Sequence, residues 1–259
     1  MATRTPSIGD HLRDWRTKRR LSQMDLALEA EISTRHLSCI ETGRAAPSRE
    51  MVLRLAEYLE VPLRERNLWL QAAGFAPVFA ERPLDDPAMR PAREAVEAVL
   101  NAHAPYPALA VDRHWNLVAA NAAVAPLMEG ADPALLAPPV NVMRLALHPR
   151  GLAPRIVNLG QLRGHLLARL ARQATMSGDA VLAELLRELR GYPAPPSSHD
   201  GTDPLAIPFR LRVGGAELSF LTTTMIFGTA AEVTLSELTV ETFFPMDEAT
   251  AAALRGAGR

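Results

Sequence analysis

The sequence predicts a multidomain protein, in which an all-α domain of five helices precedes an α+β domain with an antiparallel sheet. Helix-capping residues recur at short intervals over residues 1–75, prolines cluster after them, and the remainder mixes helical spacing with strand-like alternation. The composition, with 48% hydrophobic and 22% charged residues, excludes a disordered, collagen-like or coiled-coil chain.

Residues 1–75 are predicted to form five short helices joined by tight turns. In the first helix, Ile8, Leu12 and Trp15 recur at helical spacing. Capping residues mark the expected starts of the next four: Ser22, which forms a capping box with Asp25, then Ser33, Pro47 with Ser48, and Pro62. Gly74 is expected to end the fifth helix.

A change of composition marks the boundary after this helical unit. The stretch 75–91 contains Pro77, Pro83, Pro87 and Pro91, a density that helices rarely tolerate. We therefore predict a proline-rich linker and connecting helix over 76–104, with a helix at about 92–103, and a second domain over 105–259.

The second domain is predicted to hold about five strands. Apolar runs at 108–111 and 115–120 indicate a hairpin, and Asn121 is expected to cap the helix that follows. Helical patterns then occupy 158–175 and 179–190. Strand-like runs follow at 207–213, 217–227 and 233–244, with a tight turn at Gly214 and Gly215 between the first two. In the last run, alternation predicts a half-buried strand with Val240 on one face and Glu241 on the other.

A basic cluster lies near the start of the chain, although the net charge is only −1. Its members are Arg13, Arg16, Lys18, Arg19 and Arg20. Such a cluster indicates a local anionic partner, with nucleic acid the first candidate. A solvated helix face is an equal alternative on charge alone.

Residues 23–41 have the pattern of a helix-turn-helix. Small or branched side chains stand where the two helices and the turn would pack: Ala27, Ile32, Leu37 and Ile40. The outer side chains of the second helix are then free to enter a major groove: Thr34, Arg35, His36 and Ser38. Among them, Arg35 is the candidate to pair with guanine.

Phosphate contacts are expected around this motif. Gln23, at a helix start, is placed to bind a phosphate with its amide and its backbone N–H. Arg16, Arg20 and Arg44 are further candidates by charge and position, although a solvated surface role is equally compatible with each arginine.

The first 75 residues or so resemble the phage-repressor-like helix-turn-helix family, often called the xenobiotic response element (XRE) family. The resemblance covers 23–41 and continues through Gly43, Pro47 and Ser48 to Leu59. It implies double-stranded DNA as a partner and binding as a homodimer. Glu31 stands where the family usually has glycine at the turn, which predicts a left-handed backbone at a non-glycine residue. A helical bundle that binds no DNA is the alternative.

Most of residues 100–255 resemble the ligand-binding domain of MmyB-like transcription regulators. The matching segments are 105–112, 115–121, 144–149 and 227–229, together with Thr234-Leu235 and Glu237-Leu238. The resemblance implies a PAS-like fold, a sheet that cradles a small apolar ligand, with a fatty-acyl compound as the ligand type.

Residues in or beside the expected elements are candidates to line that pocket. The apolar ones are Trp115, Met143, Leu147, Phe220 and Phe227, for each of which ordinary core packing is the alternative. Arg144 and His148 are four residues apart and could share a helical face that holds a carboxylate. Alternatively, Arg144 reaches an acidic neighbour and His148 caps a helix end.

Catalysis, cofactors and metals find little support in the sequence. It has no glycine-rich phosphate loop, no HExxH and no Gly-x-Ser-x-Gly, and its seven histidines lack metal-ligand spacing. The single cysteine, Cys39, fits a reducing compartment. Apolar runs are too short for a membrane span and no secretory signal is recognisable, so we expect a cytoplasmic protein without a membrane partner.

Together these features predict a transcription regulator that binds a DNA operator as a homodimer and responds to a small apolar ligand. Two alternatives remain open at this stage. The chain could be a protein-interaction module, or a DNA-binding regulator whose second domain serves only for dimerisation.

Overall fold

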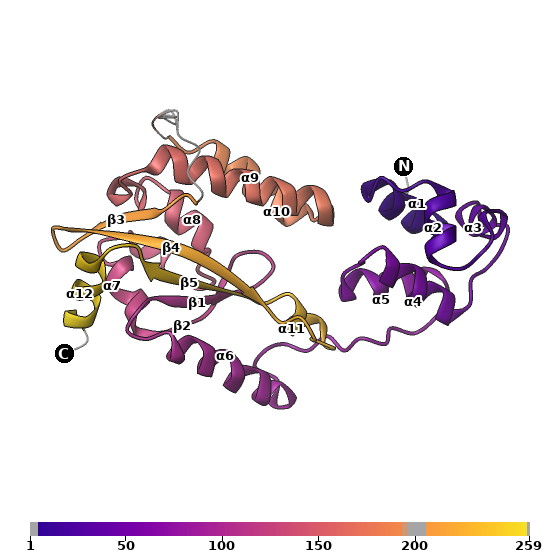
Figure 1. Ribbon diagram of the computed structural model, residues 1–259, viewed down its shortest axis with the longest axis horizontal. Coiled ribbons are helices and arrows are strands. Elements are labelled where there is room, and N and C mark those ends of the chain that lie inside the picture. The colour runs from indigo at the N-terminus through magenta and orange to yellow at the C-terminus, as the bar shows by residue number, and fades with distance from the viewer. Residues whose placement is uncertain (1–4, 194, 196–205, 258–259) are drawn as a thin grey trace. The chain divides into compact units, whose positions relative to one another are not determined.

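The chain divides into two compact units in the computed structural model, which describes residues 5–193, 195 and 206–257 (Figure 1). Unit 1 comprises residues 1–83 and 229–236, and unit 2 comprises residues 84–228 and 237–259. The second unit therefore encloses, in sequence, a short segment that folds with the first.

Unit 1 contains the five predicted helices. Their bounds are α1 (Ile8–Lys18), α2 (Gln23–Glu29), α3 (Thr34–Glu41), α4 (Arg49–Tyr58) and α5 (Leu63–Ala72). Serine side chains cap α1 to α4, and the expected capping box of Ser22 and Asp25 is present. The spacing of apolar residues turns one face of each helix inward, so that Leu12, Leu37 and Trp69 are fully buried in a common core.

Left-handed residues connect several of these helices. Arg20, Glu31 and Glu60 have φ values of 58°, 54° and 49°, although none of them is glycine. The predicted geometry at Glu31 is confirmed, and the turns after α1 and α4 repeat it. Each turn lets the chain reverse direction within a few residues, which fixes the helices close together.

Replacing Glu31 with glycine is expected to raise the thermal stability of the chain. The left-handed conformation costs a non-glycine residue about 1–2 kcal/mol, and the flexibility of glycine in the unfolded chain offsets only part of that gain. The matched control is Glu29→Gly, at the exposed last residue of α2, which should lower stability by up to about 1 kcal/mol. Thermal denaturation of both variants checks this, and a Glu31→Gly protein that melts at or below the wild-type temperature would contradict the assigned strain.

The first part of the expected linker folds against α5. The Asn67 side chain donates to the Phe79 carbonyl at 2.8 Å and accepts from the N–H groups of Val78 and Phe79, both at 3.1 Å. Ala80 then forms a parallel bridge with Glu232. Proline removes helical hydrogen bonds but does not prevent an extended segment from being held by side chains.

Unit 2 contains the five-stranded antiparallel sheet that the sequence predicts. The strands are β1 (Ala108–Val111), β2 (Leu117–Ala120), β3 (Phe209–Val213), β4 (Ala216–Ile226) and β5 (Thr239–Pro245), in the order β2-β1-β5-β4-β3. Gly214 and Gly215 form the expected turn with φ values of 57° and 85°, which favour glycine.

Helices cover both faces of the sheet. On one face α6 (Arg90–Ala102) packs against β1, β2 and β5; over the other lie α8 (Val142–Leu147), α9 (Leu159–Ser177) and α10 (Ala180–Arg190) (Figure 1). The last helix, α12 (Glu248–Ala257), packs against β4 and β5. The short helix α7 (Ala125–Met128) packs near β3. Four single 3₁₀ turns occupy Pro87–Met89, Ala122–Val124, Pro133–Leu135 and Ala153–Arg155.

Three expectations for unit 2 are wrong in detail. Residues 233–236 form the helix α11 (Val233–Ser236) in unit 1, so the last strand begins at Thr239. Glu241 is buried, because helices cover its face of the sheet as well. Asn121 makes no cap: its amide donates to the carbonyls of Leu100 and Tyr106 at 3.0 and 2.8 Å, which ties α6 to the start of β1.

Candidate functional site

Helix α3 presents polar side chains on the face opposite its buried residues. Two residues of α3 itself, Leu37 and Ile40, are fully buried on its inner face, as expected. The side chains of Thr34 and Arg35 are exposed, and those of His36 and Ser38 are half-buried. This arrangement leaves the outer face of α3 accessible to another molecule, as the helix-turn-helix pattern requires.

A buried acid, which the sequence analysis did not single out, holds the helices around α3. Glu41 is 4% exposed and accepts hydrogen bonds from Arg16 at 2.7 and 3.2 Å and from the Gln23 amide at 2.6 Å. Burial raises the pKa of Glu41, but the hydrogen bonds from Arg16 and Gln23 outweigh it and hold that pKa below its ordinary value. The Arg16 and Gln23 side chains, both expected at phosphates, are therefore engaged inside unit 1.

The other arginines expected at DNA, Arg20, Arg35 and Arg44, are exposed. Arg20, Arg35 and Arg44 form no ion pair with an acid anywhere in the part of the chain that the structure describes. In contrast, Lys18 pairs with Asp14 at 2.8 Å, and Arg19 donates to the Leu59 carbonyl at 2.9 Å. The basic cluster is thus divided between internal contacts and accessible charge.

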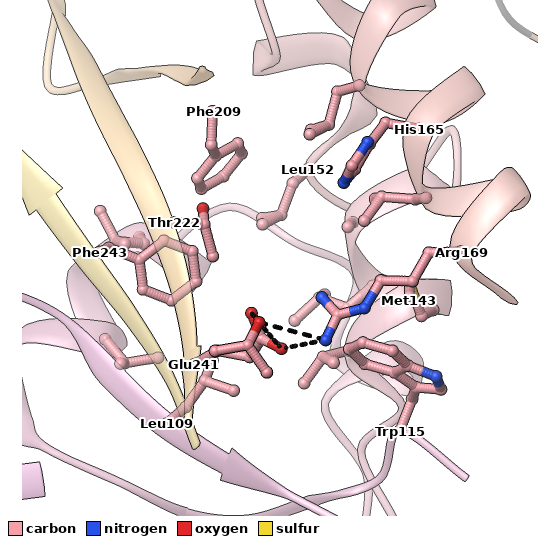
Figure 2. Close-up of a pocket in the computed structure, with 18 of the residues that line it drawn as sticks. Leu109, Trp115, Met143, Leu152, His165, Arg169, Phe209, Thr222, Glu241 and Phe243 are labelled. Carbon is pink, nitrogen blue, oxygen red and sulfur yellow. Dashed lines mark hydrogen bonds and ion pairs between the residues drawn. The ribbon is translucent and has the colours of Figure 1, made fainter. Parts of the chain in front are cut away.

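Unit 2 contains an apolar pocket of about 380 Å³, partly open to solvent, between the sheet and helices α8 and α9. Its apolar wall includes Leu109 from β1, Leu152, Phe209 from β3 and Phe243 from β5 (Figure 2). Two of the predicted ligand residues, Trp115 and Met143, belong to this lining. A cavity of this size and character is typical of small-molecule sites.

One end of the pocket is polar, and its residues come from α9, β4 and β5. Arg169 donates to the Glu241 carboxylate at 2.7 Å, and the Thr224 hydroxyl donates to the same carboxylate at 3.2 Å (Figure 2). The guanidinium of Arg169 lies over the ring of Trp115, 4.5 Å from its centroid. Trp115 is itself fixed, with a left-handed φ of 68° and a hydrogen bond of 2.8 Å to Gln173.

His165 and Thr222 complete the polar part of the lining. Desolvation lowers the pKa of His165, and the positive charges of Arg169 and Arg172 lower it further. The imidazole is therefore neutral near pH 7, and the ion pair of Arg169 and Glu241 supplies the charges of the pocket.

The expected carboxylate site of Arg144 and His148 does not form. Helix α8 ends at Leu147, so His148 lies just outside it as the C-cap, although its N–H still donates to the Arg144 carbonyl. Arg144 donates to Glu188 at 2.7 and 2.8 Å, and the Nδ1 of His148 accepts from the Arg150 backbone at 3.0 Å. These contacts match the alternative that Arg144 binds an acid and His148 ends a helix.

Three apolar candidates also lie outside the pocket lining. Leu147 and Phe220 are fully buried in the core of unit 2, and Phe227 is half-buried. The pocket instead contains two charged residues that the sequence analysis did not identify as site residues, Arg169 and Glu241. Alternation had placed Glu241 on a solvent face, and no local pattern distinguishes Arg169 from the other arginines of α9.

The described residues contain neither a metal-binding cluster nor a membrane-spanning helix. No group of three His, Cys, Asp or Glu side chains in this part of the chain could hold an ion, and no helix within it has the length and apolar character needed to cross a bilayer.

Comparison with family models matches both halves of the chain. The model for the MmyB-like transcription regulator ligand binding domain matches residues 92–257, and a helix-turn-helix domain model matches residues 7–69. Comparison with curated protein sequences gives no significant match. Both matched models describe regulator domains and not enzymes. Since the first covers more than half of the sequence, the chain belongs to the MmyB-like transcription regulators, in which a DNA-binding helix-turn-helix domain accompanies a ligand-sensing domain.

Proposed function

We propose that the chain binds a specific DNA operator as a homodimer and that a small apolar ligand of the fatty-acyl type, held in the pocket of unit 2, changes that binding. The observation that carries the proposal is that α3 buries Leu37 and Ile40 on its inner face and leaves a polar outer face accessible. In a dimer, two such helices would read half-sites about 34 Å apart. We place this activity in the cytoplasm, without a membrane partner.

The character of the pocket supports an acyl ligand. Leucine, methionine, tryptophan and phenylalanine side chains form most of its lining, and its ion pair, Arg169 with Glu241, lies at one end. A molecule with a hydrocarbon chain and a polar head would match this pocket, with the chain against the apolar lining and the head at the ion pair. Burial of the chain would provide the main free energy of binding, about 25 cal/mol per Å² of apolar surface removed from water.

The chain connectivity supports coupling between ligand and DNA. Strands β4 and β5 supply Thr224 and Glu241 to the pocket, and the segment that joins them, Thr229–Ser236, is part of unit 1. Within that unit Val233 is fully buried and donates to the Ala80 carbonyl at 2.8 Å. A ligand that favours one position of β4 and β5 could therefore bias unit 1, provided its affinity differs between the two states.

Arg35→Ala is expected to relax the DNA sequence preference at one base pair of each half-site. If the guanidinium pairs with guanine, its loss costs about 1–3 kcal/mol there and little elsewhere. Binding of the full chain to an operator in which each base pair is changed in turn measures this. The matched control is Arg187→Ala, which removes an exposed arginine of unit 2 and should leave the profile unchanged.

Two outcomes would count against the proposed function or against this role. A uniform loss over all sequences would make Arg35 a phosphate contact. Binding that does not weaken with salt would indicate a protein-interaction module, since phosphate contacts depend steeply on salt.

A further inference from the structure

The charges of the pocket are already paired. Its lining, in the described residues, contains one cation, Arg169, one anion, Glu241, and His165, whose lowered pKa keeps it neutral near pH 7. Arg169 and Glu241 contact each other at 2.7 Å. Their side chains are 23% and 6% exposed, so the pair is shielded from solvent. The net charge that the walls offer to a ligand is therefore zero.

An anionic head group would bring an unbalanced charge into this site. Transfer of a charge from water into an apolar cavity is unfavourable unless a partner of opposite charge is available. The cation of this pocket already has a carboxylate partner, which would also repel a second carboxylate placed beside it. A free fatty acid, ionised near pH 7, would thus have to displace Glu241 or bind next to it.

The pair nevertheless offers hydrogen bonds of both kinds. Guanidinium has five N–H donors, and the hydrogen bonds from Arg169 to Glu241 and Thr224 both use Nη2. The carboxylate of Glu241 can accept more hydrogen bonds than those from Arg169 and Thr224. A neutral head with a carbonyl acceptor and an N–H or O–H donor would satisfy both groups without changing the charge balance.

We propose that the pocket selects uncharged amphiphiles, in which an acyl chain carries an amide or hydroxyl-bearing head, over free fatty acids. The Arg169–Glu241 pair is the specificity determinant: Arg169 donates to the carbonyl of the head and Glu241 accepts from its N–H or O–H. This assignment rests on the proposed acyl ligand and names the chemical class of its head group.

Two probes of the same length and shape test this selectivity. Decanamide and decanoate differ in the charge of the head group and in its N–H donors. Calorimetric titration of each into the full chain near pH 7 is expected to give an affinity at least about tenfold higher for decanamide. Equal affinities, or tighter binding of decanoate, would overturn the head-group assignment and leave the acyl ligand standing. Binding of neither probe would overturn both.

A charge substitution provides the reciprocal test. Glu241→Gln leaves Arg169 as an unpaired cation, and this variant is expected to prefer decanoate. The control is Glu188→Gln, which breaks the comparable Arg144 ion pair outside the pocket and should retain the wild-type preference. An unchanged preference in Glu241→Gln would refute the role of the pair, and the wild-type comparison of the two probes does not depend on the folding of this variant.

Discussion

Glu41→Ala is expected to lower the free energy of unfolding of unit 1 by about 3 kcal/mol or more, because it removes one partner of a buried ion pair. The Arg16 side chain is 15% exposed, and without Glu41 its charge would keep only the hydrogen bond to the Leu21 carbonyl at 2.8 Å. The Gln23 amide would lose its acceptor as well. Hydrogen exchange at the amides of α1 and α3 reports on this unit alone.

The same group gives a pH dependence of defined sign. Since the folded-state pKa of Glu41 lies below its ordinary value of 4.5, its contribution to stability is present above that pH and is lost as the pH falls through the folded-state pKa. Glu41→Gln should lack this acid-dependent loss. The control, Glu29→Ala, changes an exposed acid of α2 and should alter stability by less than about 0.5 kcal/mol. A Glu41→Ala protein as stable as this control would refute the stabilising role of the hydrogen bonds that Glu41 accepts from Arg16 and Gln23.

Gly9→Ala is the second substitution with a large expected effect. A Cβ at this position of α1 would lie 2.6 Å from the Glu41 carbonyl oxygen and 2.7 Å from that of Ile40. These are backbone atoms at the end of α3, so the two helices would have to separate. We expect a loss of about 1–3 kcal/mol, as for other overpacked cores, together with weaker DNA binding because α3 would move.

The matched control for Gly9→Ala is Gly164→Ala. Gly164 also lies within a helix, α9, but a Cβ there meets nothing within 4 Å. That substitution should raise stability by about 0.5–1 kcal/mol, since alanine loses less conformational freedom on folding. Denaturant unfolding compares the two variants. If Gly9→Ala raises the free energy of unfolding, as Gly164→Ala is expected to do, the close approach of α1 and α3 does not limit the residue at position 9.

The helices of unit 1 could be predicted because their signals are local. Ser22, Ser33 and Ser48 cap their helices within three residues, and the apolar spacing identifies the buried face. The left-handed backbone at Glu31 was expected from the family resemblance, in which glycine usually occupies this turn position. Glu41 was missed because its partners are 18 and 25 residues away in sequence, so only the packed structure brings them together.

The pocket could be predicted in kind but not in its polar residues. Trp115 and Met143 followed from their place in or beside the expected elements, within a domain for which the family resemblance implied a pocket. Arg169 and Glu241 are 72 residues apart, and alternation cannot show that helices cover both faces of β5. Residues 233–236 resembled a strand because apolar Val233 and Leu235 alternate with polar Thr234 and Ser236, whereas tertiary contacts in unit 1 favour a helix there.

Selection of bound fragments from random DNA by the full chain, with and without extracted cell lipids, tests the proposed regulator most directly. We expect enrichment of one motif with two half-sites about one helical turn apart, and a change in its enrichment when lipids are present. Recovery of unrelated fragments in both arms would contradict base recognition by α3. A motif that is enriched equally in both arms would contradict control by a ligand.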